Sequence, residues 1–527
     1  MNKNRKHDEN EKFIRKEPDE RKKPKTPEQN LEELYHWNSP EKRQSSSKSS
    51  PEGSCAQKSI VWKKFEREEL EIESDWNHPS SSKRFNSSEV VVGNRRKSPE
   101  LRQSTSNQLP IRGVLRLELD PEKICYFQRN YGVTLNLDAR LGRTLGSIRE
   151  YVNEHSKEFE IFNKQLIIYY KLNKQTDDSR RRKFAIRDQL SVMIHDIFPH
   201  GYLAVGGSTV NGCGSNSSDL DLCFGIKPRE HLFDKNGNEW GKLISLDYLD
   251  NIKFVDYAIE TIYDHFENNY KDEFSLIDPV LFARVPVIKL KLKSHRDIEV
   301  DININCTAGI YNSHLLHYYS RIDERLPILA AFLKKYLDER CVIQPRHGRL
   351  NSYTVVLMII HYLQCCVDPP ILPNLNFLYP AMFDGTTDIE DLKFDQEFPT
   401  PLKDIPKNDM TVGELLLGFF DYYANFDYAY DAISMMNGMV FSRDNLGHGN
   451  HRFLFYIEEV YDGLTVPKNL TDANDLQDII RIFKDSRNRV LELNYTPTID
   501  LFLQSLKKAD LDRINDEISG ENVIIAI

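Results

Sequence analysis

The stretch from Ala204 to Ile226, AVGGSTVNGCGSNSSDLDLCFGI, places two aspartates inside an apolar run that otherwise has the pattern of a buried strand. A turn rich in glycine and serine separates this run from a shorter strand pattern, HGYLAV. Residues i and i+2 of a strand face the same side. Asp219 and Asp221 are therefore predicted to present two carboxylates to one face of a sheet, while Leu220 and Leu222 point into the core.

Asp301 supplies a third carboxylate, in the second arm of a predicted β-hairpin. Residues 285–305, VPVIKLKLKSHRDIEVDININ, alternate apolar and polar side chains on both sides of SHRD. Three carboxylates on one sheet face repel one another unless a cation lies among them. Hard oxygen ligands of this kind suit Mg²⁺ or Mn²⁺. The pattern predicts that Asp219, Asp221 and Asp301 form a two-metal site.

The Gly-Gly-Ser element before the aspartates has the composition of a phosphate-binding turn. Gly206 and Gly207 let the backbone turn sharply and approach a ligand, and amides at the next helix start, with the Ser208 hydroxyl, can hold phosphate oxygens. Two competing motifs are excluded. A nucleophile elbow needs glycine where this chain has Val210, and a P-loop needs Gly-Lys-[Ser/Thr], which the sequence lacks.

Composition favours an intracellular protein without a membrane segment. The eight cysteines form no C-x-x-C pair, which is typical of reduced thiols. The start of the chain lacks the apolar core of a signal peptide, and the longest near-apolar run, YTVVLMIIHYL, is too short to span a bilayer. We therefore expect a soluble protein in the cytoplasm, or also in the nucleus.

Charge divides the chain into two unlike parts. Residues 1–110 hold 23 basic and 19 acidic side chains, whereas residues 111–527 hold 47 and 61, a net charge of −14. The first part, with its Ser-rich segments and four [Ser/Thr]-Pro-Glu sites, is predicted to be a disordered regulatory arm over 1–115. Non-specific affinity for nucleic acid comes from cations that meet phosphates, so the acidic part is expected to need help in holding RNA.

The spacing of the motifs resembles a known superfamily. Gly207-Ser208, ten further residues, Asp219-Leu220-Asp221 and a later apolar-flanked Asp301 are similar to the signature of the polymerase-β-like nucleotidyltransferases. Downstream, DININCTAGIYNSHLL, GRLNSYTVVLMIIHYLQ and TVGELLLGFFDYYANFDY resemble the central-domain motifs of noncanonical cytoplasmic poly(A) polymerases, in particular the germ-line type, and of terminal uridylyltransferases. The resemblance covers about residues 130–500.

The resemblance implies a bilobal fold: an α/β nucleotidyltransferase domain inserted into a mainly helical central domain, with a cleft between them. It places the N-terminal part of the central domain at 116–177, the catalytic domain at 178–310, the rest of the central domain at 311–505 and a C-terminal tail at 506–527. The helical periodicity of residues 180–198 and of most of 315–430 agrees with this division.

The resemblance also implies roles for individual residues. Asp219 and Asp221 would bind both metal ions, and Asp301 the ion that activates the RNA 3′ hydroxyl. The implied nucleotide-binding residues are Gly207, Ser208, Asn312, Lys334, Ser352 and Tyr353. Three of them have ordinary alternatives: Asn312 as a helix cap, Lys334 as an exposed lysine and Tyr353 as a core residue.

The implied activity is addition of AMP from ATP to mRNA 3′ ends. At the position where uridylyltransferases place a histidine that favours uracil, this chain has Thr465, and this difference indicates ATP as the substrate. Glu459 or Asp462 would face the edge of the base. Asp338 replaces a second lysine of some uridylyl-adding relatives. The alternatives are a terminal uridylyltransferase or, from another class, an inactive nucleotidyltransferase-fold scaffold. An RNA-binding protein that docks on the central domain is the expected partner.

Overall fold

The computed structural model describes residues 120–520, apart from residues 138, 200, 227–251, 284, 448 and 494. The predicted disordered arm, 1–115, lies outside these residues. The larger helices are α3 (Pro121–Tyr131), α4 (Ala139–Glu154), α5 (Ser156–Asn173), α6 (Asp177–His195), α8 (Ile252–Asn269), α9 (Ala308–Ile322), α10 (Arg325–Glu339), α11 (Ser352–Cys365), α13 (Val412–Ala424), α14 (Ala473–Leu491) and α16 (Lys508–Gly520). Two short helices, α12 (Leu375–Leu378) and α15 (Ile499–Phe502), complete the helical set.

A five-stranded mixed sheet contains the predicted strand and hairpin. Its strands are β1 (Tyr202–Val205), β2 (Leu220–Gly225), β3 (Phe274–Val280), β4 (Val287–Leu292) and β5 (Val300–Ile304), in the spatial order β1-β2-β5-β4-β3. Strands β4 and β5 pair antiparallel as predicted, whereas β2 and β5 pair parallel. The parallel pairing joins two segments that lie about 80 residues apart in the sequence.

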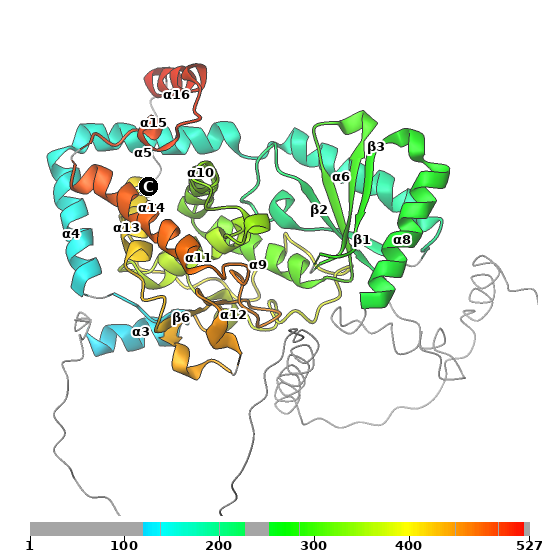
Figure 1. The fold of residues 1–527 in the computed structure, drawn as a ribbon. Coiled ribbons are helices and arrows are strands. Elements are labelled where there is room, and N and C mark those ends of the chain that lie inside the picture. Colours follow the sequence, from blue (N-terminus) through cyan, green and yellow to red (C-terminus); the bar gives the residue numbers. More distant parts are fainter. Residues whose placement is uncertain are drawn as a thin grey trace, which may run out of the picture. The chain divides into compact units, whose positions relative to one another are not determined.

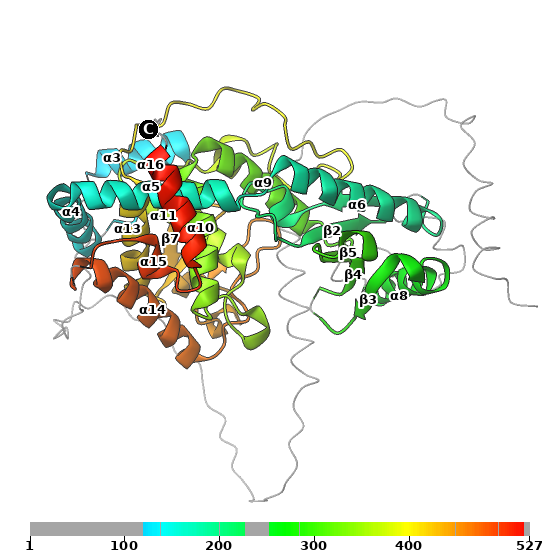
Figure 2. The ribbon, with the colours of Figure 1, turned by 90° about the horizontal axis from the view of Figure 1, so that it is seen from above.

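Helices α6 and α8 cover one face of this sheet (Figures 1 and 2). Alternate residues of β2 and β5, among them Leu220, Leu222, Val300 and Ile302, join the apolar face of α6 in one core. Because side chains alternate along a strand, Asp221 and Asp301 must lie on the opposite face of the sheet. Cys223 on that opposite face packs with Ile310 of α9.

Local sequence explains where the main helices begin. The Thr176 hydroxyl accepts a hydrogen bond from Ser179 N at the start of α6, and two aspartates occupy its first turn, where negative charge is favourable. At the start of α13, Thr411 and Glu414 form a capping box, in which each side chain accepts from the other residue's backbone amide. These caps determine where both helices begin, and each cap can be recognised in the sequence.

The remaining helices build a second apolar core. It includes buried residues of α4, α5, α9, α10, α11, α13, α14 and α15. Helix α5 also reaches the far end of the chain, because Gln165 Nε2 donates to Asn515 Oδ1 at 3.2 Å and Ile499 N donates to Gln165 Oε1 at 2.9 Å. Part of the segment expected as a C-terminal tail therefore packs on α5 as α16.

Residues 315–430, predicted to be mostly helical, contain one long irregular segment. No helix or strand occupies residues 379–411, between α12 and α13. Polar side chains of α9 hold this segment instead: the Tyr311 hydroxyl donates to Thr387 O at 2.6 Å and the Tyr318 hydroxyl donates to Gln396 O at 2.7 Å. The three helical examples within this range, α10, α11 and α13, agree with the prediction.

A small three-stranded sheet lies beside the helices. Its strands are β6 (Asp431–Ser434), β7 (Met439–Ser442) and β8 (Ile457–Glu458), in the order β7-β6-β8. The turn that follows β8 returns Thr465 to bridge with Glu458. This sheet carries Glu459 to the side of α11.

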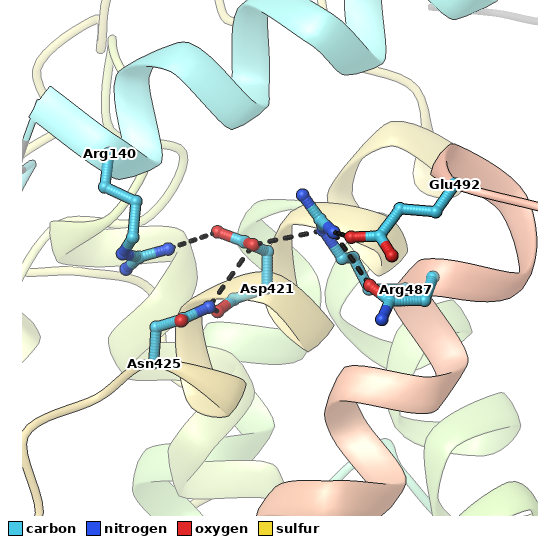
Figure 3. A network of polar contacts seen from close by, with 6 residues as sticks. Arg140, Asp421, Asn425, Arg487 and Glu492 are labelled. Carbon is cyan, nitrogen blue, oxygen red and sulfur yellow. Dashed lines mark hydrogen bonds and ion pairs between the residues drawn. The ribbon is translucent and has the colours of Figure 1, made fainter.

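A buried ion network ties three helices of the second core together (Figure 3). Asp421 of α13, with 3% of its side chain exposed, lies 2.6 Å from Arg140 Nη1 of α4 and 3.3 Å from Arg487 Nε of α14. Arg487 Nη1 also contacts Glu492 Oε1 at 2.5 Å, and Asn425 Nδ2 donates to Asp421 Oδ1 at 3.4 Å. The network satisfies a carboxylate that would otherwise be buried without a counter-charge.

Across the described residues, none of the helices combines the length and apolar character that crossing a membrane requires.

Candidate active site

The site begins at two aspartates in register on adjacent parallel strands. Asp221 of β2 and Asp301 of β5 are Cα partners in the β2–β5 ladder. Asp219 precedes β2 by one residue, so its side chain lies two positions before Asp221 on the same side of the chain. The sheet thus brings together on one face the three carboxylates that the sequence predicted.

Gly207 fits closely against Asp221. It has φ +61°, a left-handed conformation that favours glycine, and a Cβ atom built on it would lie 1.9 Å from Asp221 Oδ2. The turn that follows is a single 3₁₀ turn, Gly207–Thr209. The Gly207 amide donates to Ser313 Oγ of α9 at 2.7 Å. This amide therefore already has an acceptor. A single 3₁₀ turn also offers fewer backbone amides to a phosphate than the helix start expected from the sequence.

The carboxylates repel one another. Burial, followed by the charges of Asp301 and Asp219, raises the pKa of Asp221 to about 6, although water reaches its side chain. Burial also raises the pKa of Asp219, with smaller effects from Glu299 and Asp301. A carboxylate that solvent reaches and that neighbouring carboxylates repel is expected to favour a cation as partner.

Lys289 compensates part of this negative charge. It lies opposite Asp301 in the β4–β5 ladder, and its ammonium forms an ion pair with Asp301 Oδ2. About a quarter of each side chain is exposed, 28% for Lys289 and 25% for Asp301. The lysine therefore occupies one side of the carboxylate that was predicted as a metal ligand.

The donor chemistry of the site fits a hard divalent cation, but the ligands are not closed around one. Within the described ranges, no group of three or more His, Cys, Asp or Glu side chains is arranged to hold a metal ion as it stands. Asp221 and Asp301 offer oxygen donors from paired positions, and their repulsion would be relieved by a cation. The ion pair with Lys289 engages Oδ2 of Asp301, so a cation at this site would share that carboxylate with the lysine.

A second group joins α9, α11 and the segment after β8. The Tyr353 hydroxyl donates to Asn312 Oδ1 at 2.6 Å and contacts Glu459 Oε1 at 3.3 Å. Glu459 Oε2 accepts the amides of Tyr461 and Asp462 at 2.7 and 2.6 Å. Burial, followed by the charge of Asp462, raises the pKa of Glu459 to about 7. Three residues named from the sequence are thereby connected in one network.

The other predicted nucleotide-binding residues have separate positions. Lys334 of α10 donates to Cys213 O at 2.9 Å, in the loop after the Gly-Ser turn, and burial lowers its pKa. Ser352 is exposed at the first residue of α11. Thr465 is buried; its hydroxyl donates to Phe455 O and accepts from Ile457 N. Its side chain is therefore committed to the local backbone.

Lys183 of α6 is a buried residue near the aspartates that the sequence motifs did not include. None of its side chain is exposed, and its ammonium donates to Gln175 Oε1 at 3.0 Å. Burial lowers the pKa of Lys183 to about 8, against the opposing effect of the charges of Asp219 and Asp221. The signal was present in the periodicity, because Lys183 lies three and seven residues before the buried Ile186 and Leu190.

Two family models match this chain. Residues 162–321, which contain the sheet and its aspartates, match the mitochondrial-like poly(A) RNA polymerase central palm domain. Residues 411–463, which contain α13 and Glu459, match the Cid1 family poly A polymerase domain. The order of the two domains agrees with the resemblance inferred from the motifs.

Curated relatives are similar over the same region. The poly(A) RNA polymerase gld-2 of Caenorhabditis elegans is 33% identical over 293 residues, which cover 54% of this chain and 24% of that protein. GLD2-B of Xenopus laevis is 31% identical over 323 residues, 60% of this chain and 58% of that protein. The chain thus spans from about a quarter to somewhat over half the length of these relatives.

Solved structures share the fold. A chain from the GLD-2/RNP-8 complex is 28% identical, with a TM-score of 0.54, and the match covers 66% of this chain and 98% of that one. A cytoplasmic RNA terminal U-transferase is 23% identical, with a TM-score of 0.51, and the match covers 66% of this chain and 99% of that one; this likeness concerns the fold alone. The predicted fold class, a nucleotidyltransferase domain within a helical central domain, is confirmed. By sequence, fold and domain order, this chain is similar to the noncanonical poly(A) polymerases of the GLD-2 type.

Proposed function

We propose that this chain is a template-independent RNA adenylyltransferase, which transfers AMP from ATP to the 3′ end of an RNA. The observation that carries the proposal is the in-register pair Asp221 and Asp301, held beside the left-handed Gly207 turn. A sheet face with three mutually repelling carboxylates has no structural use, because it lowers stability. Similarity to the GLD-2 polymerases supports the assignment of that face to nucleotidyl transfer.

In this proposal Asp219, Asp221 and Asp301 hold Mg²⁺ or Mn²⁺. Such ions, when bound, stabilise the attacking and leaving oxygens of an in-line displacement at phosphorus. Asp301 would act on the side of the RNA 3′ hydroxyl, with Lys289 beside it. Gly207 and Ser208 would bring the turn close to the triphosphate, since only glycine fits at position 207 against the Asp221 carboxylate.

The nucleotide would lie between this turn and the Asn312–Tyr353–Glu459 network. Asn312 would contact the ribose, Tyr353 the base, and Lys334 and Ser352 the triphosphate. The hydroxyl of Tyr353 is hydrogen-bonded to Asn312, and this bond fixes the orientation of the aromatic ring. The buried and engaged hydroxyl of Thr465 supports a base site without the imidazole of a uridylyltransferase.

The domain boundaries and partners belong to the same proposal. Residues 178–310 would be the catalytic domain and residues 116–177 with 311–505 the central domain. An RNA-binding protein would dock on the central domain and supply affinity for message, as the acidic net charge of residues 111–527 requires. The cytoplasm is the proposed site of action.

The test is primer extension with purified protein. An oligoadenylate primer is incubated with Mg²⁺ and ATP, UTP, GTP or CTP in separate reactions, beside the Asp219→Ala variant as a matched control. We expect ATP to be added most efficiently and the variant to add nothing. Preferred addition of UTP would identify a uridylyltransferase, and absence of transfer with every nucleotide and either metal would favour the inactive scaffold.

A further inference from the structure

Lys183 and Gln175 form a buried contact next to the candidate site that the proposed function does not use. Lys183 of α6 is fully buried, and its ammonium contacts Gln175. Moving an ammonium group out of water costs several kcal/mol per ion unless the protein replaces its hydration. A lysine in this position has to be compensated by specific contacts, and these contacts lead toward the Gly207 turn.

The first contact runs through Gln175, in the short link between α5 and α6. Its Oε1 accepts from Lys183 Nζ at 3.0 Å, and its Nε2 donates to Thr209 O at 2.8 Å. The backbone amide of Gln175 also donates to Gly214 O at 3.0 Å. One glutamine therefore joins the buried lysine to both ends of the loop 209–214.

The contacts continue to the first aspartate. Thr209 Oγ1 donates to Asp219 O at 3.4 Å, directly before β2. Neighbouring residues of the link add support, because Thr176 N donates to Asn216 Oδ1 at 2.8 Å and Lys174 bridges with Ser215. From the other side, Lys334 of α10 holds Cys213 O. The loop between the Gly-Ser turn and the aspartates is thus fixed from two directions.

We propose that Lys183 and Gln175 act as positioning residues, which fix the loop 209–214 and so set the distance between the Gly207–Ser208 turn and the Asp219–Asp221 pair. The positive charge of Lys183 also offsets part of the repulsion between these aspartates. The inference rests on the proposed function, since the turn and the aspartates matter together only if they handle one substrate. Misplacement of reacting groups by about 1 Å can reduce a rate about 10²-fold.

The first experiment compares Lys183→Met, Gln175→Leu and the double variant with wild type. Met keeps the length of the Lys183 side chain but removes its charge. Gln175 is only half-buried, so Gln175→Leu is expected to fold and to test the connection even if Lys183→Met does not fold. In primer extension we expect kcat to fall about 10- to 100-fold in each single variant, with KM for the primer changed less than about twofold. The double variant is expected to be no worse than the poorer single variant, because both break one connection.

The second measurement is amide hydrogen exchange, which needs no activity. We expect faster exchange over residues 207–219 in both single variants and unchanged exchange in α13 and α14. Ile186→Val, a volume change on the same buried face of α6, is the control for core damage: it is expected to lower the melting temperature without changing kcat or exchange in the loop.

The inference is overturned if both single variants keep kcat within about twofold and leave loop exchange unchanged, or if their effects on kcat multiply in the double variant. A wild-type protein that adds no nucleotide would disprove the proposed function instead. In that case the exchange measurement still decides whether Lys183 and Gln175 hold the loop.

Discussion

Two aspartates in this molecule have opposite electrostatic surroundings. Asp421 lies between two arginines from different helices and accepts a further hydrogen bond from Asn425 (Figure 3). Asp221 lies beside Asp219 and Asp301, whose charges add to burial in raising its pKa to about 6. The first arrangement serves the fold. The second opposes it, which is the cost expected from the metal-binding role proposed for Asp221.

Among the substitutions that distinguish the two regions, Asp221→Asn is expected to have the largest effect, a loss of nucleotide transfer. The variant keeps the shape of the side chain but removes a charge, so transfer should fall on the order of 10³-fold or more, consistent with loss of several kcal/mol of metal-assisted stabilisation. Its melting temperature should equal or exceed that of wild type, because repulsion is relieved. Initial rates of primer extension and thermal unfolding measure the two quantities; a variant with most of its activity would exclude Asp221 from the site.

Asp421→Ala should show the reverse pattern. Removal of the carboxylate leaves two guanidinium groups without their shared partner, and such changes in buried ion pairs lower the free energy of unfolding by about 3–5 kcal/mol. We expect the lower end, because Arg140 and Arg487 keep 31% and 23% of their side chains exposed. Urea denaturation of the variant and of wild type measures this change in the free energy of unfolding. Asp409→Ala, which breaks an exposed pair with Arg149, is the control and should change stability by less than about 1 kcal/mol.

A smaller effect on stability is expected from Gly207→Ala. The left-handed backbone costs a non-glycine residue about 1–2 kcal/mol, and the new methyl group would collide with the Asp221 carboxylate. Transfer should fall in parallel, since the carboxylate has to move. Gly146→Ala in α4 is the matched control: nothing lies within 4 Å of its Cβ position, so this variant should gain about 0.5–1 kcal/mol. Equal behaviour of the two variants would contradict the close contact at Gly207.

The smallest effect concerns pH. Because the pKa of Asp221 is raised from 3.8 to about 6, the folded protein binds this proton more tightly than the unfolded chain. Stability from this group is therefore full below about pH 4 and is lost as the pH rises to about 6. We expect the stability difference between Asp221→Asn and wild type to grow in favour of the variant over that range. A difference that stays constant between pH 4 and pH 7 would show that Asp221 is not repelled.

The sequence allowed prediction of the features that depend on short-range periodicity. The two-residue spacing of Asp219 and Asp221, the hairpin of β4 and β5 and the helix α6 all follow from alternation or helical repeats, and the structure agrees. The convergence of Asp301 with Asp219 and Asp221 on one sheet face was also predicted, but the parallel pairing of β2 with β5 was not, because no local pattern specifies which distant strand is a neighbour.

What the sequence did not reveal depends on contacts across the fold. Lys183 stands in the run RRRK, which has the composition of an exposed basic surface; its spacing from Ile186 places it on the buried face of α6, but its contact with Gln175 could not be read from that spacing. Lys289 was seen as a polar residue of an alternating strand, without its ion pair to Asp301. The sequence also did not indicate that Ser313, more than 100 residues later, accepts the hydrogen bond of the Gly207 amide.

The bonds that connect Gln165 with Ile499 and Asn515 have a consequence for how the protein is made. Translation proceeds at about 5–20 residues per second, so α5 leaves the ribosome roughly 17–70 s before Ile499, 334 residues later, exists to join it. The strands β1 to β5 are all synthesised within that interval and can pair first. Until the last helices emerge, α4 and α5 present the apolar side chains of an unfinished core, and during this interval the nascent chain is expected to depend most on chaperones.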